Sequence, residues 1–356
     1  MTVGHLESRG EAPRPAVEGS RPSLATVLQD RDTQRLLVNI AIILVIGVFV
    51  HLHGGGKFFT ERNLNALVVQ IGVVSIISCA MTLVMVAGAI DVSVSGIVML
   101  SGIVSGMLIV DGMPMWMAFV LATLVGVGVG LVNSFLVIGV GITSLIATIG
   151  TLYVTQGVAN LLTNGLPIAG LPAEFSTVGS GFAFGVPITL PIVLAVVALF
   201  IAIQRFTRLG RHIVATGSNP QAAFLNGVDI RRTLTVCFML SGAAAGWGGV
   251  MYASRIGNPA PVLDNDLLFQ VIVAIVIGGT VLTGGQGSVL GTFVGAVLIG
   301  VVNQALNLLG VSTFWQFIAL GALLVFSVGS DQVLRGNGAR SARRRLIERL
   351  ARRSRT

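Results

Sequence analysis

Ten apolar segments of 16 to 24 residues follow one another along the chain, and none contains Asp, Glu, Lys or Arg. A helix that crosses a bilayer needs about 20 mostly apolar residues, whereas the strands of a membrane β-barrel alternate in polarity. With 54% hydrophobic and 10% charged residues, the chain has too little polar surface for a water-soluble globule. We therefore predict an all-α integral membrane protein, a bundle of about ten transmembrane helices. The predicted segments are 36–51, 66–87, 94–110, 115–138, 142–162, 187–203, 233–252, 267–283, 288–306 and 314–330.

The distribution of basic side chains predicts the orientation of this bundle, because cytoplasmic loops carry an excess of Lys and Arg. With ten crossings and a cytoplasmic N-terminus, 19 of the 22 basic residues lie inside: five in the tail 1–35, five in the loop 204–232 and nine in the tail 331–356. One crossing more or fewer would put the loop and the C-terminal tail on opposite sides. We expect both termini in the cytoplasm and a transmembrane domain over 36–330.

The two tails differ in composition. The tail 1–35 balances five acidic against five basic residues and is expected to be mostly disordered, with a short helix near 24–35. The arginine-rich stretch 339–356 is either a basic amphipathic helix on the membrane surface or a solvated tail. Its charge forms a tail rather than a groove and aromatic residues are few, so we expect contact with anionic lipids and not with nucleic acid.

Motifs that would let the chain power itself are missing. Gly54-Gly55-Gly56-Lys57 lacks the spacing and the hydroxyl residue of a phosphate-binding loop. The segments offer no carboxylate for a proton or sodium relay, which weakens a secondary transporter without excluding one, since backbone carbonyls can also hold sodium. No catalytic set is found, and His51-x-His53 resembles a metal pair only superficially. We predict a chain that is not an enzyme and binds no metal or cofactor.

Glycines recur at short intervals inside three apolar segments, a pattern that favours close helix packing in a membrane. These are Gly126, Gly128 and Gly130, the pair Gly242-x-x-x-Gly246 and the pair Gly291-x-x-x-Gly295.

Polar residues gather first in Gly88-Ala89-Ile90-Asp91-Val92-Ser93-Val94-Ser95-Gly96. Asp91 and Ser93 have oxygens that can cap the following helix. A charge flanked by serines at membrane depth can also line a transport path. The two interpretations are compatible, and both stay open.

A second polar cluster lies in the inner loop, at 217–229. Ser218 and Gln221 have the spacing of a capping box, Pro220 suits a first helical turn, and Gly227 suits a left-handed end. We predict a short helix on the cytoplasmic face, either packed on the bundle as a connection or seated in a partner's groove. The residues expected on its surface are Ala222, Ala223 and Leu225.

The third polar cluster comprises 277–280 and 284–288, which are rich in glycine and contain no charged residue. We expect the backbone to turn sharply here, on the cytoplasmic side, because glycine permits the dihedral angles that a tight turn needs. Its composition is similar to that of 88–96, a hint of internal repetition.

At these places the chain resembles the permease subunits of bacterial ABC sugar importers of the ribose, xylose and galactose type. The resemblance runs from about residue 40 to 330, with the motifs in the same order. Ala89 departs from the family's second glycine, and Leu268-Phe269-Gln270 stands where relatives often carry an acidic residue, which bears on the solute rather than the fold. The matching stretches are Gly88 to Ser93, Ala147-Thr148-Ile149-Gly150-Thr151, Gly157, Asn164-Gly165-Leu166-Pro167-Ile168, Asn219-Pro220-Gln221-Ala222-Ala223 to Gly227, Gly278-Gly279-Thr280 to Gly287-Ser288, and Asn307-Leu308-Leu309-Gly310-Val311-Ser312.

The resemblance implies a multi-pass permease of the bacterial inner membrane that moves a small polar solute, a monosaccharide or polyol, by alternating access. It implies separate ATPase subunits that use the ATP, a second permease copy or paralogue, and a periplasmic or lipid-anchored substrate-binding protein. The alternative is a secondary transporter or facilitator. The candidate pathway residues are Asp91, Ser93, Ser95 and Thr148. The candidates for the ATPase coupling helix are Ser218, Asn219, Pro220, Gln221, Ala222, Ala223 and Gly227.

Overall fold

A computed structural model describes residues 31–262, 265–325 and 329, and most of this part is helical. The expected C-terminal amphipathic helix at 339–356 lies outside the described residues, as does the tail up to residue 30. The first described helix begins at Arg31, so its first turn falls within the segment expected to be a tail.

The helices follow the apolar segments of the sequence. In chain order they are α2 (Arg31–His53), α3 (Glu61–Val86), α4 (Val94–Val110), α5 (Met115–Ser134) with the π-helical η1 (Phe135–Val140), α6 (Ser144–Thr163), the short η2 (Ala173–Phe175) and α7 (Ser176–Ser180), α8 (Thr189–Phe206), α9 (Arg208–Ser218), α10 (Pro220–Leu225), α11 (Ile230–Ile256), α12 (Asn265–Ile277) and α13 (Val289–Leu308). A two-stranded antiparallel hairpin, β1 (Phe182–Ala183) and β2 (Val186–Pro187), pairs Phe182 with Pro187.

Length and composition separate the helices into two classes. Seven described helices are long and apolar enough to cross a membrane: 33–53, 61–86, 115–140, 144–163, 189–206, 230–256 and 289–308. Three shorter apolar helices cover Val94–Val110, Asp266–Ile277 and Thr313–Val325. The chain is thus an all-α, multi-pass membrane protein.

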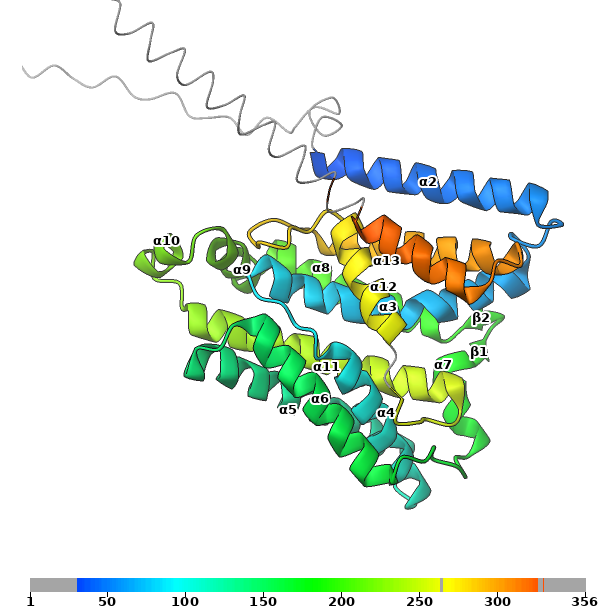
Figure 1. Cartoon of the computed structure of the whole chain (residues 1–356), viewed down its shortest axis with the longest axis horizontal. Coiled ribbons are helices and arrows are strands. Elements are labelled where there is room, and N and C mark those ends of the chain that lie inside the picture. The colour runs from blue at the N-terminus through cyan, green and yellow to red at the C-terminus, as the bar shows by residue number, and fades with distance from the viewer. Residues whose placement is uncertain (1–30, 263–264, 326–328, 330–356) are drawn as a thin grey trace, which may run out of the picture.

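The long helices form two groups, which Figure 1 shows one above the other. In one group, α13 packs on α2, α3 and α12, and α3 packs on α8. In the other, α4 packs on α5, α6 and α11, and α11 packs on α5. Helix α11 also packs on α3 and so connects the groups. The segment 87–93, between α3 and α4, runs from the first group to the second (Figure 1).

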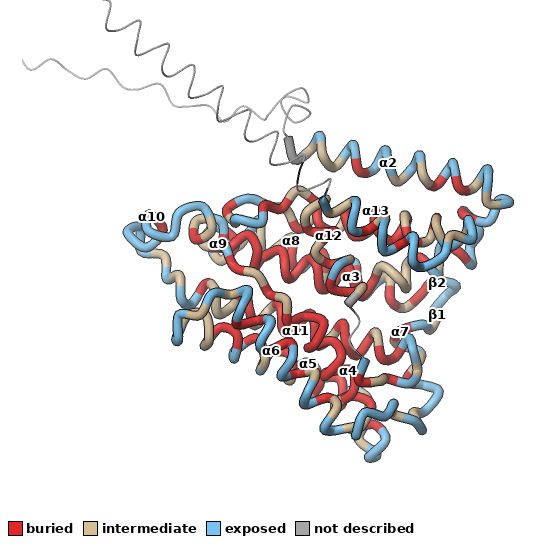
Figure 2. The backbone as a smooth tube through the Cα atoms, viewed as in Figure 1, coloured by how far each residue is buried: buried red, intermediate tan, exposed pale blue. Residues whose placement is uncertain are grey.

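Burial is concentrated where the two groups meet. Figure 2 shows mostly buried residues along α3, α4 and α11, whereas α2, α6 and α10 are largely exposed. The exposed side chains of α2 and α6 are mainly apolar, among them Val45 and Leu161. Because such side chains suit a lipid or a partner surface rather than water, the exposure pattern agrees with a membrane location.

Close helix packing on glycine is confirmed for most of the predicted positions. A Cβ on Gly126 would overlap the carbonyl oxygen of Gly242, and one on Gly295 would overlap that of Ala274, so α5 meets α11, and α13 meets α12, backbone to backbone. Gly128 is the exception, since no atom lies within 4 Å of a Cβ built there.

The predicted span 267–283 is wrong for its last six residues, 278–283. Helix α12 ends at Ile277, and 278–288 turns back without helix. Gly279 causes the break, because its φ of +93° is left-handed and unfavourable for residues with a side chain.

Candidate functional site

The segment 87–93 carries Asp91, the one charged side chain that is fully buried in the described part of the chain. Asp91 Oδ1 accepts hydrogen bonds from the amide of Ser93, at 3.1 Å, and from its hydroxyl, at 2.5 Å. Asp91 Oδ2 accepts one from the hydroxyl of Ser241 on α11, at 2.8 Å. A buried carboxylate is tolerated only where hydrogen bonds replace its water, and these three donors do so.

The contacts of Ser93 extend this arrangement to two further helices. Its Oγ accepts a hydrogen bond from Nδ2 of Asn133 on α5, at 2.7 Å. Asn133 Oδ1 accepts in turn from the hydroxyl of Thr151 on α6, at 2.6 Å. In this series of hydrogen bonds, the hydroxyl of Thr151, the amide of Asn133 and the hydroxyl of Ser93 all donate in the direction of Asp91. Hydrogen bonds arranged in this order strengthen one another.

The backbone of the segment is held by α6. The amide of Ile90 donates to Ser144 Oγ and that of Val92 donates to Thr148 Oγ1, both at 3.1 Å. The start of α4 is therefore fixed to three other helices. We call this set the polar network: Asp91, Ser93, Asn133, Ser144, Thr148, Thr151 and Ser241.

The capping prediction for this segment is correct only in part. Asp91 accepts from the amide of Ser93, which immediately precedes α4. Ser93 occupies the N-cap position but makes no side-chain capping bond, because Asp91 and Asn133 engage its hydroxyl.

The four pathway candidates are not all brought together. Asp91, Ser93 and Thr148 belong to the polar network, whereas Ser95 Oγ is buried with no hydrogen-bond partner among the described residues. All four are buried within the chain, so a role in solute passage stays a prediction.

The loop 204–232 contains two helices, α9 and α10, of which the sequence predicted the second. The predicted N-cap is wrong by one residue: Asn219 Oδ1 accepts from the amide of Ala222 at 3.0 Å. Ser218 instead ends α9, where its hydroxyl donates to the carbonyl of Val214 at 2.7 Å. The left-handed end at Gly227 is confirmed by its φ of +80°.

The exposed surface of α10 also differs from the predicted one. Ala223 is 5% exposed, because the helix turns this residue toward α9 and α11, on which it packs. Ala222 and Leu225 are exposed as predicted, Leu225 to 84%. Phe224, which the sequence did not single out, is 70% exposed. An exposed aromatic side chain next to an exposed leucine on a short helix is a feature of a contact surface.

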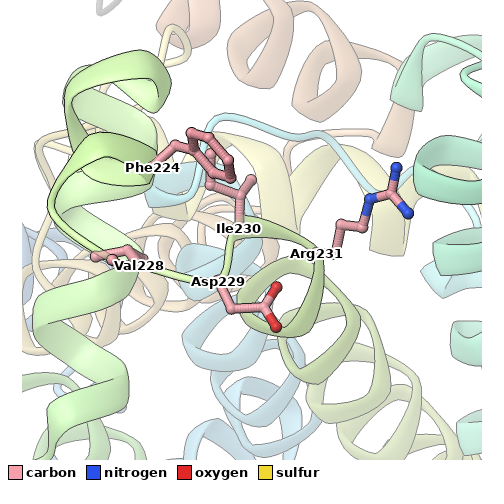
Figure 3. A pocket seen from close by; sticks show the side chains of 6 residues that line it. Phe224, Val228, Asp229, Ile230 and Arg231 are labelled. Carbon is pink, nitrogen blue, oxygen red and sulfur yellow. The ribbon is translucent and has the colours of Figure 1, made fainter.

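A shallow pocket of ≈ 490 Å³ opens beside this helix, where α10 leads into α11. Figure 3 shows Phe224 next to Ile230, with Asp229 and Arg231 pointing away from them. The pocket is thus apolar in its body and charged at its edge. Exposed arginines surround this end of the molecule: Arg205, Arg208, Arg211, Arg231 and Arg232.

The third polar cluster meets the other two. The amide of Gly285 donates to the carbonyl of Val86 at 2.8 Å, and the hydroxyl of Ser218 lies 3.4 Å from the carbonyl oxygen of Gly285. Three stretches that the sequence separates widely, 86–88, 217–218 and 284–285, therefore lie against one another.

Four of the seven residues of the polar network were not among the candidates predicted from the sequence. Asn133, Ser144, Thr151 and Ser241 lie inside apolar helices, where isolated polar side chains are the available signal. Such residues are common in membrane helices, so the signal alone does not say which of them meet. Among the described residues, no group of three or more His, Cys, Asp or Glu is placed to hold a metal.

Residues 63–328 match the family described as the permease component of branched-chain amino acid transport systems. The ribose import permease protein of Haemophilus influenzae is 30% identical over 86% of this chain and 94% of its own length. The D-allose transport system permease protein of Escherichia coli is 30% identical over 82% and 90%. The L-arabinose ABC transporter permease protein of Azospirillum brasilense is 35% identical over 78% and 82%. No solved structure matches the chain significantly.

Proposed function

Because the chain belongs to the family of permease subunits of ATP-binding cassette importers, we propose that it forms the membrane path of a sugar importer that moves a monosaccharide. The observation that carries the proposal is the similarity to permeases of ribose, allose and arabinose along nearly their whole length. The chain itself binds no cofactor and performs no covalent chemistry in this proposal, and the ATP is used by separate ATPase subunits.

We place the protein in a bacterial inner membrane with ten crossings and both termini in the cytoplasm. Seven span-length helices and three shorter apolar ones give ten apolar helices in the described residues. The arrangement of basic residues supports the orientation, with α9, α10 and the arginines around them on the cytoplasmic side.

The ATPase docks on α10 in this proposal. Phe224 and Leu225 offer it apolar anchors, and the pocket beside them offers a recess with a charged edge (Figure 3). The surrounding arginines favour an acidic surface on the partner. Ser218 to Gly227 remain the coupling segment, with Ala223 as the residue that seats it on the bundle.

A second permease copy or paralogue completes the solute path, and a substrate-binding protein delivers the solute from the periplasmic side. Three of the four buried candidates, Asp91, Ser93 and Thr148, support the path from within one subunit, since they fix the start of α4 to α6 and α11. Alternating access then consists of movements of helix groups driven from the cytoplasmic face.

Uptake into proteoliposomes tests the proposal. The chain is reconstituted alone, with its ATPase, and with its ATPase and binding protein, and the probes are labelled D-ribose, D-allose and L-arabinose. We expect accumulation of one of these sugars that requires all components and ATP. Flux through the chain alone, unaffected by ATP, would instead identify a facilitator.

A further inference from the structure

Three backbone stretches meet at the cytoplasmic end of the molecule, and we call them the glycine junction: 86–88 after α3, 217–218 at the end of α9, and 284–285 between α12 and α13. Their shared contacts are the hydrogen bond from the Gly285 amide to the Val86 carbonyl, at 2.8 Å, and the close approach of Ser218 to Gly285. Gln204 of α8 supports the third stretch, since its Nε2 donates to the Gly287 carbonyl at 2.9 Å.

The junction has no room for a side chain at three of its glycines, Gly217, Gly284 and Gly285. A Cβ on Gly217 would overlap the Val86 carbonyl oxygen and lie 2.5 Å from the Gly285 nitrogen. A Cβ on Gly285 would lie 2.8 Å from the Ser218 Cα, and one on Gly284 would lie 2.7 Å from the Gly88 Cα. Contacts between backbones cannot relax by changing a rotamer, so a displacement of one stretch must displace the others.

The junction and the polar network share one short segment. Gly88 belongs to the junction, and Ile90, Asp91 and Val92, two to four residues further on, are fixed to α6 and α11. Residues 217–218, on the other side of the junction, are the last two residues of α9, and only Asn219 separates them from α10.

We propose that the glycine junction is the positioning element through which movement of α10 reaches the polar network, and that Gly217 is its central residue. This inference rests on the proposed function, because it takes α10 to be the helix on which the ATPase acts. When the ATPase displaces α10, residues 217–218 move with it, and their backbone contacts displace 86–88 and 284–285. The segment 87–93 then pulls on α4, α5, α6 and α11 through Asp91 and its partners.

The test compares Gly217→Ala with Gly128→Ala in the complete transporter, reconstituted with its ATPase and binding protein. Both changes add one methyl group to a helical glycine, but no atom lies within 4 Å of a Cβ at Gly128. We expect Gly217→Ala to retain bound ATPase and ATP hydrolysis while the sugar taken up per ATP falls roughly tenfold, the size of a typical coupling between sites. Gly128→Ala should behave as the unmodified chain.

Hydrogen exchange supplies a readout that needs no solute. Trapping the ATPase with ATP and vanadate should change the exchange of amides in 87–93 in the unmodified complex, and the change should be lost in Gly217→Ala. If Gly217→Ala fails to fold, Gly285→Ala replaces it. Its control is Gly141→Ala. Both glycines have a left-handed φ, +80° at Gly285 and +86° at Gly141, but only at Gly141 would an added Cβ meet open space.

The outcomes separate the two proposals. If no ATPase binds the unmodified chain and uptake needs none, the proposed function fails. If the unmodified transporter couples ATP to uptake, and Gly217→Ala couples equally well with the same exchange response in 87–93, only the role of the junction is overturned.

Discussion

The polar network and the glycine junction hold the two ends of the same segment by opposite means. At Asp91 the segment is held by side-chain oxygens and nitrogens from α5, α6 and α11. At Gly88 it lies against the backbone of Gly217 and Gly284, two glycines at which an added Cβ would meet backbone atoms. The first region should therefore be damaged by removing atoms and the second by adding them.

The difference also separates stability from movement. Hydrogen bonds to a buried carboxylate stabilise one arrangement of helices. Backbone packing without side chains fixes the distance between neighbouring stretches while leaving few bonds to break. The network is suited to keep four helices together, and the junction to pass on a displacement.

Asp91→Ala should have the largest effect on stability. It leaves the Ser93 and Ser241 donors buried without an acceptor, at a cost of about 3 kcal/mol, and should lower the Tm of the detergent-solubilised protein by several degrees. Asp111→Ala, at an exposed loop position after α4, is the matched control. An unchanged Tm for Asp91→Ala would show that the network does not stabilise the bundle.

Ser241→Ala removes a single donor from Asp91 and should destabilise the protein by about 2 kcal/mol, as measured by thermal unfolding. Ser105→Ala is the comparison, because the Ser105 hydroxyl is also buried but bonds only the Gly102 carbonyl of its own helix, at 2.8 Å. Equal losses in the two variants would contradict a special role for the carboxylate.

Asn219→Ala should cost about 1 kcal/mol, confined to α10, because it removes the hydrogen bond that caps this helix. Hydrogen exchange of the α10 amides should accelerate while that of 87–93 stays the same in the absence of ATPase. Gln221→Ala, an exposed change on the same helix, serves as control. Faster exchange in both segments would mean that the junction depends on α10 being folded.

Ser218→Ala should have the smallest effect, below about 0.5 kcal/mol. Its only hydrogen-bonding contact across the junction is 3.4 Å long, which is a weak bond, and the backbone contacts remain. A loss of stability as large as that of Ser241→Ala would show that the junction, like the network, is held by side chains.

Much of this arrangement could be predicted from the sequence because membrane helices follow from apolar runs. The apolar segments up to α11, the close packing at Gly126 and Gly242, and a short helix that ends before Gly227 can all be predicted from the sequence. The end of α12 at Ile277 was not, because Thr280 to Thr283 continue the apolar run after the glycines that break the helix.

The site was harder to predict than the helices. Asp91 and Ser93 stand out in the sequence as polar residues in an apolar region. Their partners Asn133 and Ser241 lie 40 or more positions away along the chain, and only the packing of α5 and α11 brings these partners within hydrogen-bonding distance. The N-cap of α10 differs from the predicted residue for a local reason. Both Ser218 and Asn219 can cap a helix, but Ser218 is the last residue of α9, so Asn219 caps α10.

The linkage between α10 and the polar network is tested most directly by a distance between spin labels at Gln221 on α10 and Ile146 on α6. Both positions are exposed, and the native cysteines Cys79 and Cys237 are buried. In the assembled transporter, we predict the same Gln221–Ile146 distance in the nucleotide-free and vanadate-trapped states, because α10 and α6 move together, and a changed distance in Gly217→Ala. A distance that changes equally in the unmodified chain would contradict the account.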